Sequence, residues 1–233
     1  MNNEVRQDIE KMIETDDLEG LLKKAGELHG HYCSHLVYGV KAGHHALQYL
    51  GSGNIGMEEV ITIIETNNCF SDGIQMVTGC TFGNNALIYR DYGKTAATVS
   101  KRDGKAVRLS MSPSFQESRK DVYPEAMELF DRLVVQRQEG SPEDYEKMQR
   151  LWIDMAFTEL NVPVEEMFRI ETLNIEVPEF APMFESIICE SCGENVMKTR
   201  IVETAGKSFC IPCAHAGYME LNGSGMLSKE QAT

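Results

Sequence analysis

The stretch HGHYCSHLVYGVKAGHHALQYL, residues 29–50, joins a cluster of possible metal ligands to an amphipathic segment. Residues 29–35 hold three of the six histidines and one of the seven cysteines of the chain. Downstream, Leu36, Val40 and Leu47 fall on roughly one face of a helix, and small glycine and alanine residues between them favour close packing. The pattern predicts that HGHYC lies at the N-terminus of this helix.

The composition indicates a globular protein with at least one core, because 42% of its 233 residues are hydrophobic. The formal net charge is -14, which would be repelled by a nucleic-acid backbone or an anionic membrane surface. The longest apolar run, VITII at residues 60–64, is far shorter than the roughly 20 residues that span a bilayer. The acidic first residues lack the apolar segment of a secretory signal. We therefore expect no nucleic-acid or membrane partner and a cytoplasmic location.

Apolar periodicity and turn residues predict the secondary structure that follows. A helix capped by Ser71 or Asp72 is expected after the strand at 60–64. The remaining predicted elements are helices over 3–15, 17–27, 124–138 and 141–160, a hairpin of TAATVSK and KAVRLSMS around an Asp-Gly turn, and a strand over 168–177. PEFAPM (178–183), with two prolines, is the best domain boundary.

Two CxxC pairs, Cys189 with Cys192 and Cys210 with Cys213, lie seventeen residues apart. Four thiolates at this spacing are typical of a structural, tetrahedral zinc site that leaves no open position for a substrate. The residues between the pairs predict a hairpin, and a short helix is expected at the second pair, as in a treble-clef or ribbon finger. His215 is interpreted as a bystander, and the module as a folding and docking element.

A second cluster of ligand-type residues lies in the first half of the chain. His29 and His31 flank a glycine, so both imidazoles can reach one metal ion. Cys33 and Cys69 stand at predicted helix starts, where free amides and the helix dipole lower a thiol pKa. Such a thiolate is either a nucleophile or a soft metal ligand, and the sequence does not separate the two. Cys80 is as compatible with packing as with ligation.

Three segments resemble the FmdE family, whose members are similar to one component of formylmethanofuran dehydrogenase, over residues 25–220. These segments are HGHYCSHLVYGVKAG, DGIQMVTGCTFGNNALIYRDYGK and CESCGENVM with CIPC. The resemblance implies an α+β fold: a core domain of mixed helix and antiparallel sheet (1–180), commonly dimeric, with a treble-clef zinc finger (187–220). The small, polar residues 222–233 predict a disordered tail.

The resemblance also implies a pocket built from two motifs. It assigns to this pocket His29, Gly30, His31, Cys33, Cys69, Asp72, Gln75, Thr78, Gly79, Cys80, Thr81, Gly83 and Asn84, with Asp91, Gly93 and Lys94 downstream. One departure is that Cys33-Ser34-His35 stands where the family usually has Cys-Pro-Gly. His35 is accordingly either an additional ligand or a bystander.

Three functions fit these residues. The first is an accessory protein for molybdenum or tungsten enzyme subunits of one-carbon metabolism, which holds a second transition metal (zinc, nickel or iron) in the core. The chain lacks a ferredoxin-type cysteine run, so it does not hold that enzyme's own clusters. The second is an enzyme with Cys69 or Cys33 as nucleophile and His31 as base. The third is a docking protein that uses the finger, or the acidic helices at 124–160, on a dimeric scaffold.

Overall fold

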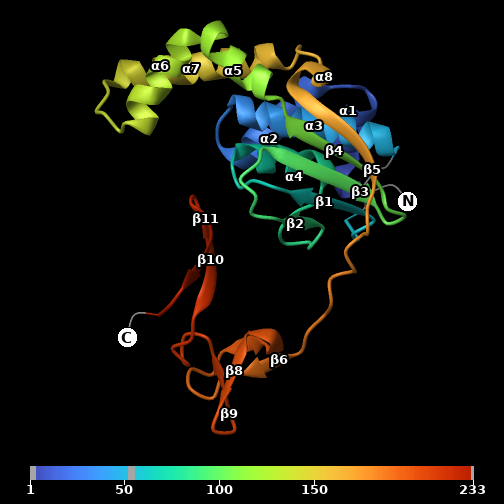
Figure 1. Ribbon diagram of the computed structural model, residues 1–233, viewed down its shortest axis with the longest axis vertical. Helices are drawn as coiled ribbons and strands as arrows, with labels where there is room; N and C mark the ends of the chain where they lie inside the picture. The colour runs from blue at the N-terminus through green and yellow to red at the C-terminus, as the bar shows by residue number, and fades with distance from the viewer. Residues whose placement is uncertain (1–3, 52–55, 232–233) are drawn as a thin grey trace. The chain divides into compact units, whose positions relative to one another are not determined.

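The computed structural model describes residues 4–51 and 56–231. They divide between Pro178 and Glu179 into two compact units, at the start of the PEFAPM segment. Figure 1 labels most of the helices and strands of each unit. None of the helices in the described ranges is both long enough and apolar enough to cross a membrane.

The first unit is a mixed α+β domain. Its helical segments are η1 (Glu4–Arg6), α1 (Gln7–Glu14), α2 (Leu18–His29), α3 (Ser34–Leu50), α4 (Cys69–Thr78), α5 (Pro113–Val122), α6 (Pro124–Phe130), the π-helical turn η2 (Asp131–Val135), α7 (Pro142–Glu159) and α8 (Val164–Met167). Its strands are β1 (Val60–Ile64), β2 (Leu87–Tyr89), β3 (Ala96–Lys101), β4 (Lys105–Met111) and β5 (Phe168–Asn174).

The five strands form one sheet in the order β2-β1-β3-β4-β5. Only the pairing of β1 with β2 is parallel, and the other neighbours are antiparallel. The predicted Asp-Gly turn joins β3 to β4, with Gly104 at φ 88°, a left-handed conformation that glycine adopts without steric cost. All five residues of β1 are buried, as its unbroken apolar run predicts.

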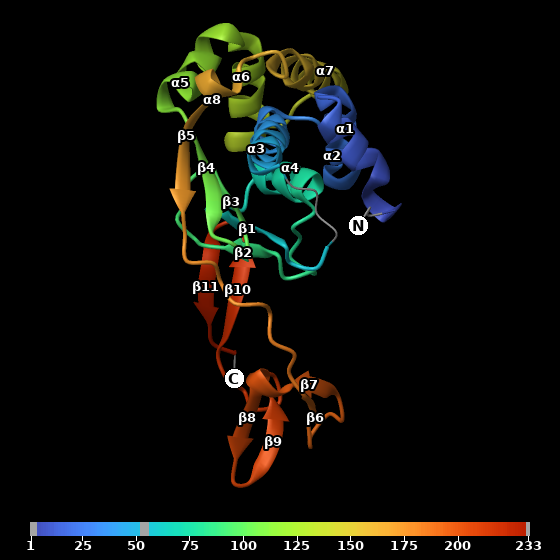
Figure 2. The same ribbon diagram turned by 90° about the vertical axis from the view of Figure 1, so that its right-hand side faces the viewer.

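Helices α1 to α4 cover one side of the sheet (Figure 2). Here the backbones of α3 and α4 touch where the two helices cross. A Cβ atom on Gly39 would lie only 2.1 Å from the carbonyl oxygen of Phe70. A Cβ on Gly73 would lie 2.4 Å from the carbonyl oxygen of Leu36. The close packing expected from the small residues of α3 is thus present, and it brings the N-terminal ends of both helices together.

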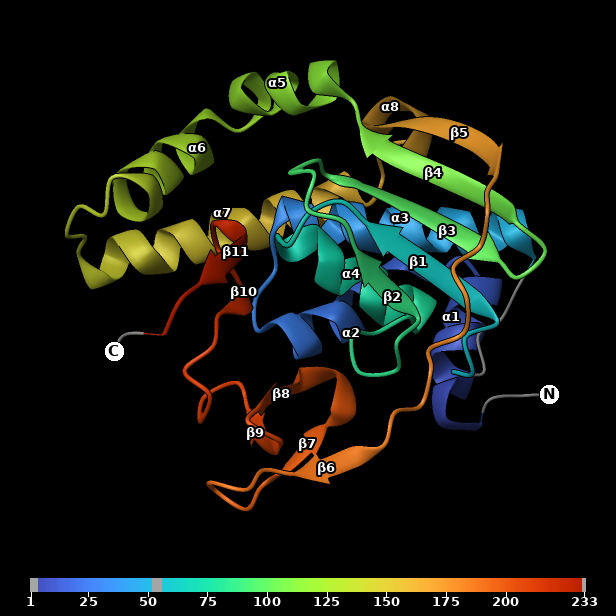
Figure 3. The same cartoon turned by 60° about the horizontal axis from the view of Figure 1, so that its bottom comes forward.

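Helices α5 to α7 extend from the sheet as an arm (Figure 3). All three have proline at their first position, where it costs no hydrogen bond: α5 at Pro113, α6 at Pro124 and α7 at Pro142. The arm has a small core of its own, formed by Leu129, Leu133 and Met148. Helix α5 was not predicted from the sequence.

The second unit consists of short two-stranded sheets. Its strands are β6 (Ser186–Ile188), β7 (Asn195–Met197), β8 (Ile201–Thr204), β9 (Lys207–Cys210), β10 (Tyr218–Asn222) and β11 (Gly225–Lys229), with η3 (Lys198–Arg200) before β8. The hairpin expected between the CxxC pairs is β8–β9.

Two features of this unit differ from expectation. Turns occupy residues 211–215 in place of the short helix expected at the second CxxC pair. Strands β10 and β11 form a hairpin, so its turn and second strand lie in residues 222–233, the segment expected to be a disordered tail. Its turn is fixed by the Asn222 side chain, which accepts from the Ser224 amide at 2.9 Å, and by Gly225 at φ 98°.

Candidate metal centre

Four side chains from three helix ends meet in the first unit. His29 is the last residue of α2, which ends at Gly30 in a left-handed conformation, and His31 follows in the loop. Cys33 is the N-cap of α3, and Cys69 is the first residue of α4. One ligand atom from each of the four lies within 4.8 Å of the others. The described chain therefore brings together two imidazoles and two thiols.

Helix α4 begins earlier than the sequence predicts. The predicted N-cap at Ser71 or Asp72 is wrong, because the Asn68 side chain accepts from the Phe70 amide at 3.0 Å and caps the helix there. Ser71 instead donates its hydroxyl to the carbonyl oxygen of Thr66 at 2.7 Å. The earlier start makes Cys69 part of the first turn, next to the free amides of the helix N-terminus.

Asp72 holds the ring of His29 in place. The Nδ1 atom of His29 lies 2.7 Å from Oδ2 of Asp72, so Nδ1 carries the proton and donates. The other nitrogen, Nε2, is buried and has no hydrogen-bond partner among the described residues. A buried imidazole nitrogen normally has a partner, and a carboxylate behind the opposite nitrogen is the usual arrangement for a histidine that binds a metal.

The two thiols act as a pair. Their mutual hydrogen bond raises the pKa of Cys33 and lowers that of Cys69 to about 5, with the nearby imidazoles of His29 and His31 also favouring the Cys69 thiolate. Burial lowers the pKa of His29, but the hydrogen bond to Asp72 and the charge of the nearby Cys69 thiolate outweigh it, so the pKa of His29 is raised. The centre thus favours a Cys69 thiolate beside the imidazoles of His29 and His31, with Cys33 as a neutral thiol.

These residues fit a tetrahedral transition metal. Ligand atoms around tetrahedral zinc are about 3.3–3.8 Å apart for Zn–S and Zn–N bonds of usual length. The observed limit of 4.8 Å requires only a small contraction to reach this geometry. Two imidazoles and two thiolates suit zinc, nickel or iron better than the hard cations that prefer oxygen.

The centre is open on the side of His31. This residue is exposed, and its ring centroid lies 4.3 Å from that of His29. The ring centroid of Trp152, on α7, lies 5.9 Å from that of His31. Nothing in the sequence around Trp152 predicts this contact, because the tryptophan and the histidine cluster are distant in the chain. Trp152 is the only tryptophan of the sequence.

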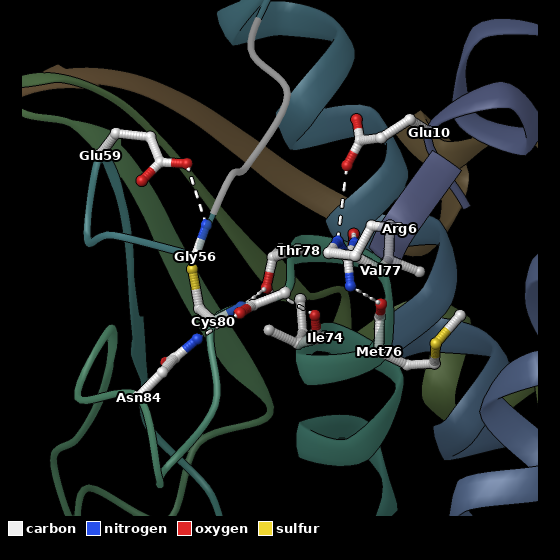
Figure 4. Close-up of polar contacts among 11 residues, drawn as sticks. Arg6, Glu10, Gly56, Glu59, Ile74, Met76, Val77, Thr78, Cys80 and Asn84 are labelled. Carbon is white, nitrogen blue, oxygen red and sulfur yellow. Dashed lines mark hydrogen bonds and ion pairs between the residues drawn. The ribbon is translucent and has the colours of Figure 1, made fainter. Parts of the chain in front are cut away.

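Two candidate ligands lie outside the four-residue cluster. His35, at the start of α3, packs its ring against Tyr38 at 5.4 Å between centroids, and burial lowers its pKa. Cys80, labelled in Figure 4, is fully buried in the core. Its Sγ lies 3.4 Å from the carbonyl oxygen of Val60. The structure brings neither residue to the candidate metal centre.

The rest of the second motif builds the turn after α4. The guanidinium of Arg6 donates to the carbonyl oxygens of Met76 and Val77 at this helix end (Figure 4). Asn84 fastens the loop, because its side chain donates to the carbonyl oxygen of Gly79 at 2.8 Å and accepts from the Thr81 amide at 2.9 Å. Arg6 and Asn84 thus hold the backbone of the turn after α4 in place.

Three further motif residues, Thr78, Asp91 and Lys94, make polar contacts near the site. Thr78 donates its hydroxyl to the carbonyl oxygen of Ile74 at 2.7 Å. The DYGK segment follows β2: the Tyr89 hydroxyl donates to Asp91 at 2.7 Å, and the Lys94 amide donates to the carbonyl oxygen of Glu65. These contacts hold in place the backbone at the end of α4 and the backbone that follows β2.

The second unit gathers its four cysteines as predicted. Cys189, Cys192, Cys210 and Cys213 place their sulfur atoms within 4.8 Å of one another. The backbone amides of Cys192 and Cys210 lower the pKa of Cys189 to about 6, and the Cys213 amide donates to Cys210 at 3.4 Å. Amides that stabilise thiolates in this way are typical of a structural zinc site.

Fold and site together define a two-unit protein: an α+β domain with a His/Cys cluster and a four-cysteine zinc finger. The chain matches the family model described as FmdE, molybdenum formylmethanofuran dehydrogenase operon, over residues 28–169. It belongs to the FmdE family. Residues 182–216 match the prokaryotic dksA/traR C4-type zinc finger.

Two relatives place the chain further. It is 40% identical over 206 residues to a probable S-adenosyl-L-methionine-binding protein of Archaeoglobus fulgidus, a match that covers 86% of this chain. The chain spans only 54% of the length of that relative. The crystal structure of a tungsten formylmethanofuran dehydrogenase FmdE-like protein from Syntrophus aciditrophicus has the same fold, with a TM-score of 0.53 at 18% identity. That match covers 84% of this chain and 91% of the other.

Proposed function

We propose that the first unit binds a transition metal through His29, His31, Cys33 and Cys69. The observation that carries the proposal is the buried Nε2 atom of His29, which has no hydrogen-bond partner in the described chain while Asp72 occupies Nδ1. Three more ligand atoms lie within 4.8 Å, so four donors are present for a tetrahedral ion. Zinc, nickel and iron are the metals that suit these donors.

We further propose that the protein is an accessory factor for molybdenum or tungsten enzymes of one-carbon metabolism. Membership of a family named after the formylmethanofuran dehydrogenase operon supports this role. The exposure of His31 supports it as well, because a ligand at the surface lets an ion exchange with a partner. The family resemblance supports a homodimer, and cysteine pairs spaced for metal binding and not for disulfides support a cytoplasmic location.

Metal analysis of the full-length chain tests the metal centre. We expect two ions per chain after reconstitution with zinc, one in the finger and one in the core. The Cys33→Ser, Cys69→Ser double variant should retain one ion. His45→Gln, a half-buried histidine elsewhere on α3, is the matched control and should retain two. One ion in the wild-type chain with an intact finger would overturn the proposal.

A second candidate function uses the same atoms for thiolate catalysis. Cys69 lies at the N-terminus of α4, where the amides and the helix dipole stabilise a thiolate, and the imidazoles beside it can accept a proton. Metal-free protein should then react with iodoacetamide at Cys69 at least tenfold faster than unfolded protein does. Equal rates would remove this candidate.

A further inference from the structure

A cleft of about 420 Å³ opens beside the candidate metal centre. This volume lies within the range of roughly 300–1,000 Å³ that is typical of small-molecule sites. The cleft shares Asp72 with the centre, and its apolar walls are Leu28, Met76 and Phe82. The function proposed above makes no use of it.

The apolar mouth of the cleft is exposed but held in place. Phe82 is 70% exposed and Leu28 is 62% exposed. The Phe82 backbone is fixed, since its amide donates to Oε1 of Gln75 at 3.3 Å and the Asn84 side chain fastens the same loop. An exposed aromatic ring on a fixed loop is a preformed stacking surface for a planar ligand.

The polar wall of the cleft is suited to a hydrogen-bond donor. The Asp72 side chain is 37% exposed, and each of its oxygens has a second lone pair beyond the bonds to His29 and Gln75. Thr81 accepts from the Asn84 amide at 3.2 Å, so its hydroxyl hydrogen can reach a ligand acceptor.

The cation that lines the cleft, Arg6, already has partners. Arg6 donates to two backbone carbonyls and lies 3.5 Å from Glu10. A phosphate or carboxylate ligand would have to compete with these contacts, whereas an uncharged ring would not. The cleft chemistry therefore favours a flat, uncharged ligand with both a donor and an acceptor.

We propose that this cleft binds a planar heteroaromatic ring that carries an amino group, and that its occupancy is coupled to the core metal through Asp72 and Gln75. The coupling part rests on the proposed metal centre. The amino group donates to Asp72, the ring stacks on Phe82, and a ring nitrogen accepts from Thr81.

A continuous chain of hydrogen bonds carries the coupling. His29 donates to Oδ2 of Asp72, and Gln75 donates to Oδ1 at 3.1 Å. Gln75 in turn accepts from the Phe82 amide. A ligand that donates to Asp72 weakens the hold of this carboxylate on His29 and makes the imidazole a poorer metal ligand. Metal and ligand therefore oppose each other, and by linkage the effect is reciprocal, on the order of fivefold.

Calorimetric titration of the full-length chain with adenosine tests the cleft. We expect saturable binding, and at least tenfold weaker binding of inosine, which presents a carbonyl oxygen to Asp72 where adenosine presents an amino group. Phe82→Ala should weaken adenosine binding at least tenfold. Tyr92→Ala, which removes another aromatic ring that is 58% exposed, is the matched control and should change it less than twofold. Equal binding to wild type and Phe82→Ala, or no saturable binding, would overturn the proposal.

Zinc affinity measured with and without saturating adenosine tests the coupling. We expect about fivefold weaker zinc binding in the core when adenosine is present. Gln75→Met, which keeps the side-chain length but removes both hydrogen bonds, should lessen this difference without abolishing it, because Asp72 still contacts both the ligand and His29, and the zinc count should stay at two. An unchanged zinc affinity in the wild-type chain would overturn the coupling. If the core takes up no metal, the proposed metal function fails, and the Phe82→Ala titration still decides the cleft.

Discussion

The Nδ1 atom of His29 lies 2.7 Å from Oδ2 of Asp72, although the two residues are 43 positions apart in the chain. One residue ends α2 and the other lies in the first turn of α4. The contact fixes the tautomer of His29 and leaves Nε2 as the nitrogen available to a metal beside the two cysteines. Asp72 therefore tunes the imidazole that serves as a candidate ligand.

Asp72→Asn should weaken zinc binding in the core by about 10- to 100-fold, because a neutral amide no longer raises the basicity of the imidazole. Competition with a chromophoric chelator measures the two zinc affinities of the chain. The finger affinity should be unchanged. Asp121→Asn, an exposed carboxylate on α5, is the control. A core affinity within twofold of wild type would contradict the role of Asp72.

The fluorescence of Trp152 should report metal binding in the core. Its ring lies 5.9 Å from that of His31, so a paramagnetic Co²⁺ ion in the core should quench most of the tryptophan fluorescence. Zinc loaded first into the finger restricts cobalt to the core. Trp152→Phe should abolish the signal without changing the number of ions bound. If binding of the second ion leaves the tryptophan fluorescence unchanged, that ion is bound away from His31 and Trp152.

Gly39→Ala should destabilise the fold by about 1–3 kcal/mol or more, because its Cβ would lie 2.1 Å from the Phe70 carbonyl oxygen and force α3 from α4. The zinc affinity of the core should fall with it, since Cys33 and Cys69 belong to the starts of these two helices. Urea unfolding measures the first effect and chelator competition the second. Gly83→Ala is the control, because a Cβ there meets no atom within 4 Å.

Cys80→Ala should separate packing from ligation. Removal of this buried sulfur should lower the free energy of unfolding by about 1–2 kcal/mol. The chain should still bind two zinc ions, because Cys80 lies outside the cluster. A loss of the core ion, with the fold intact by circular dichroism, would return Cys80 to the ligand set.

His44 should make stability depend on pH. Burial lowers its pKa, with Lys41 and His45 acting in the same direction, while the Ile13 carbonyl and Asp16 oppose them. The unfolded chain therefore binds a proton more readily than the folded chain. The His44 contribution to stability is present above the unfolded pKa of about 6.5 and is lost as the pH falls through and below it.

Urea unfolding of wild type and His44→Gln between pH 5 and 8 measures this contribution. The stability of the wild type should fall more steeply on acidification than that of the variant, by at most about 1.4 kcal/mol per pH unit. Their difference isolates His44 from the other histidines. Parallel curves would show that His44 is protonated alike in both states.

Features that depend on local chemistry could be predicted from the sequence. The VITII strand, the Asp-Gly hairpin and the CxxC pairs each carry their signal within a few residues. The cluster of His29, His31, Cys33 and Cys69 needed the family resemblance to join its two halves, because no local pattern connects residue 33 to residue 69. The family itself is confirmed by the matching model.

Features that depend on distant contacts could not be predicted. The start of α4 is set by Asn68, an N-cap that competes with equally suitable residues nearby. Strand β11 lies in the small, polar segment 222–233, whose weak strand propensity is outweighed by its pairing with β10. Trp152 reaches His31 only because the arm of α5 to α7 turns back, and the resemblance gave no sign of the cleft at Phe82.

The four candidate ligands come from three helix ends, so metal binding and folding stability are linked. An ion bound there holds the ends of α2, α3 and α4 together, so it binds the folded chain and not the unfolded one. Each tenfold rise in free metal above the dissociation constant then adds about 1.4 kcal/mol to the stability. If the core binds a metal as proposed, we expect the abundance of the protein to follow the metal supply of the cell, since chains that remain empty unfold more often and are the first to be degraded.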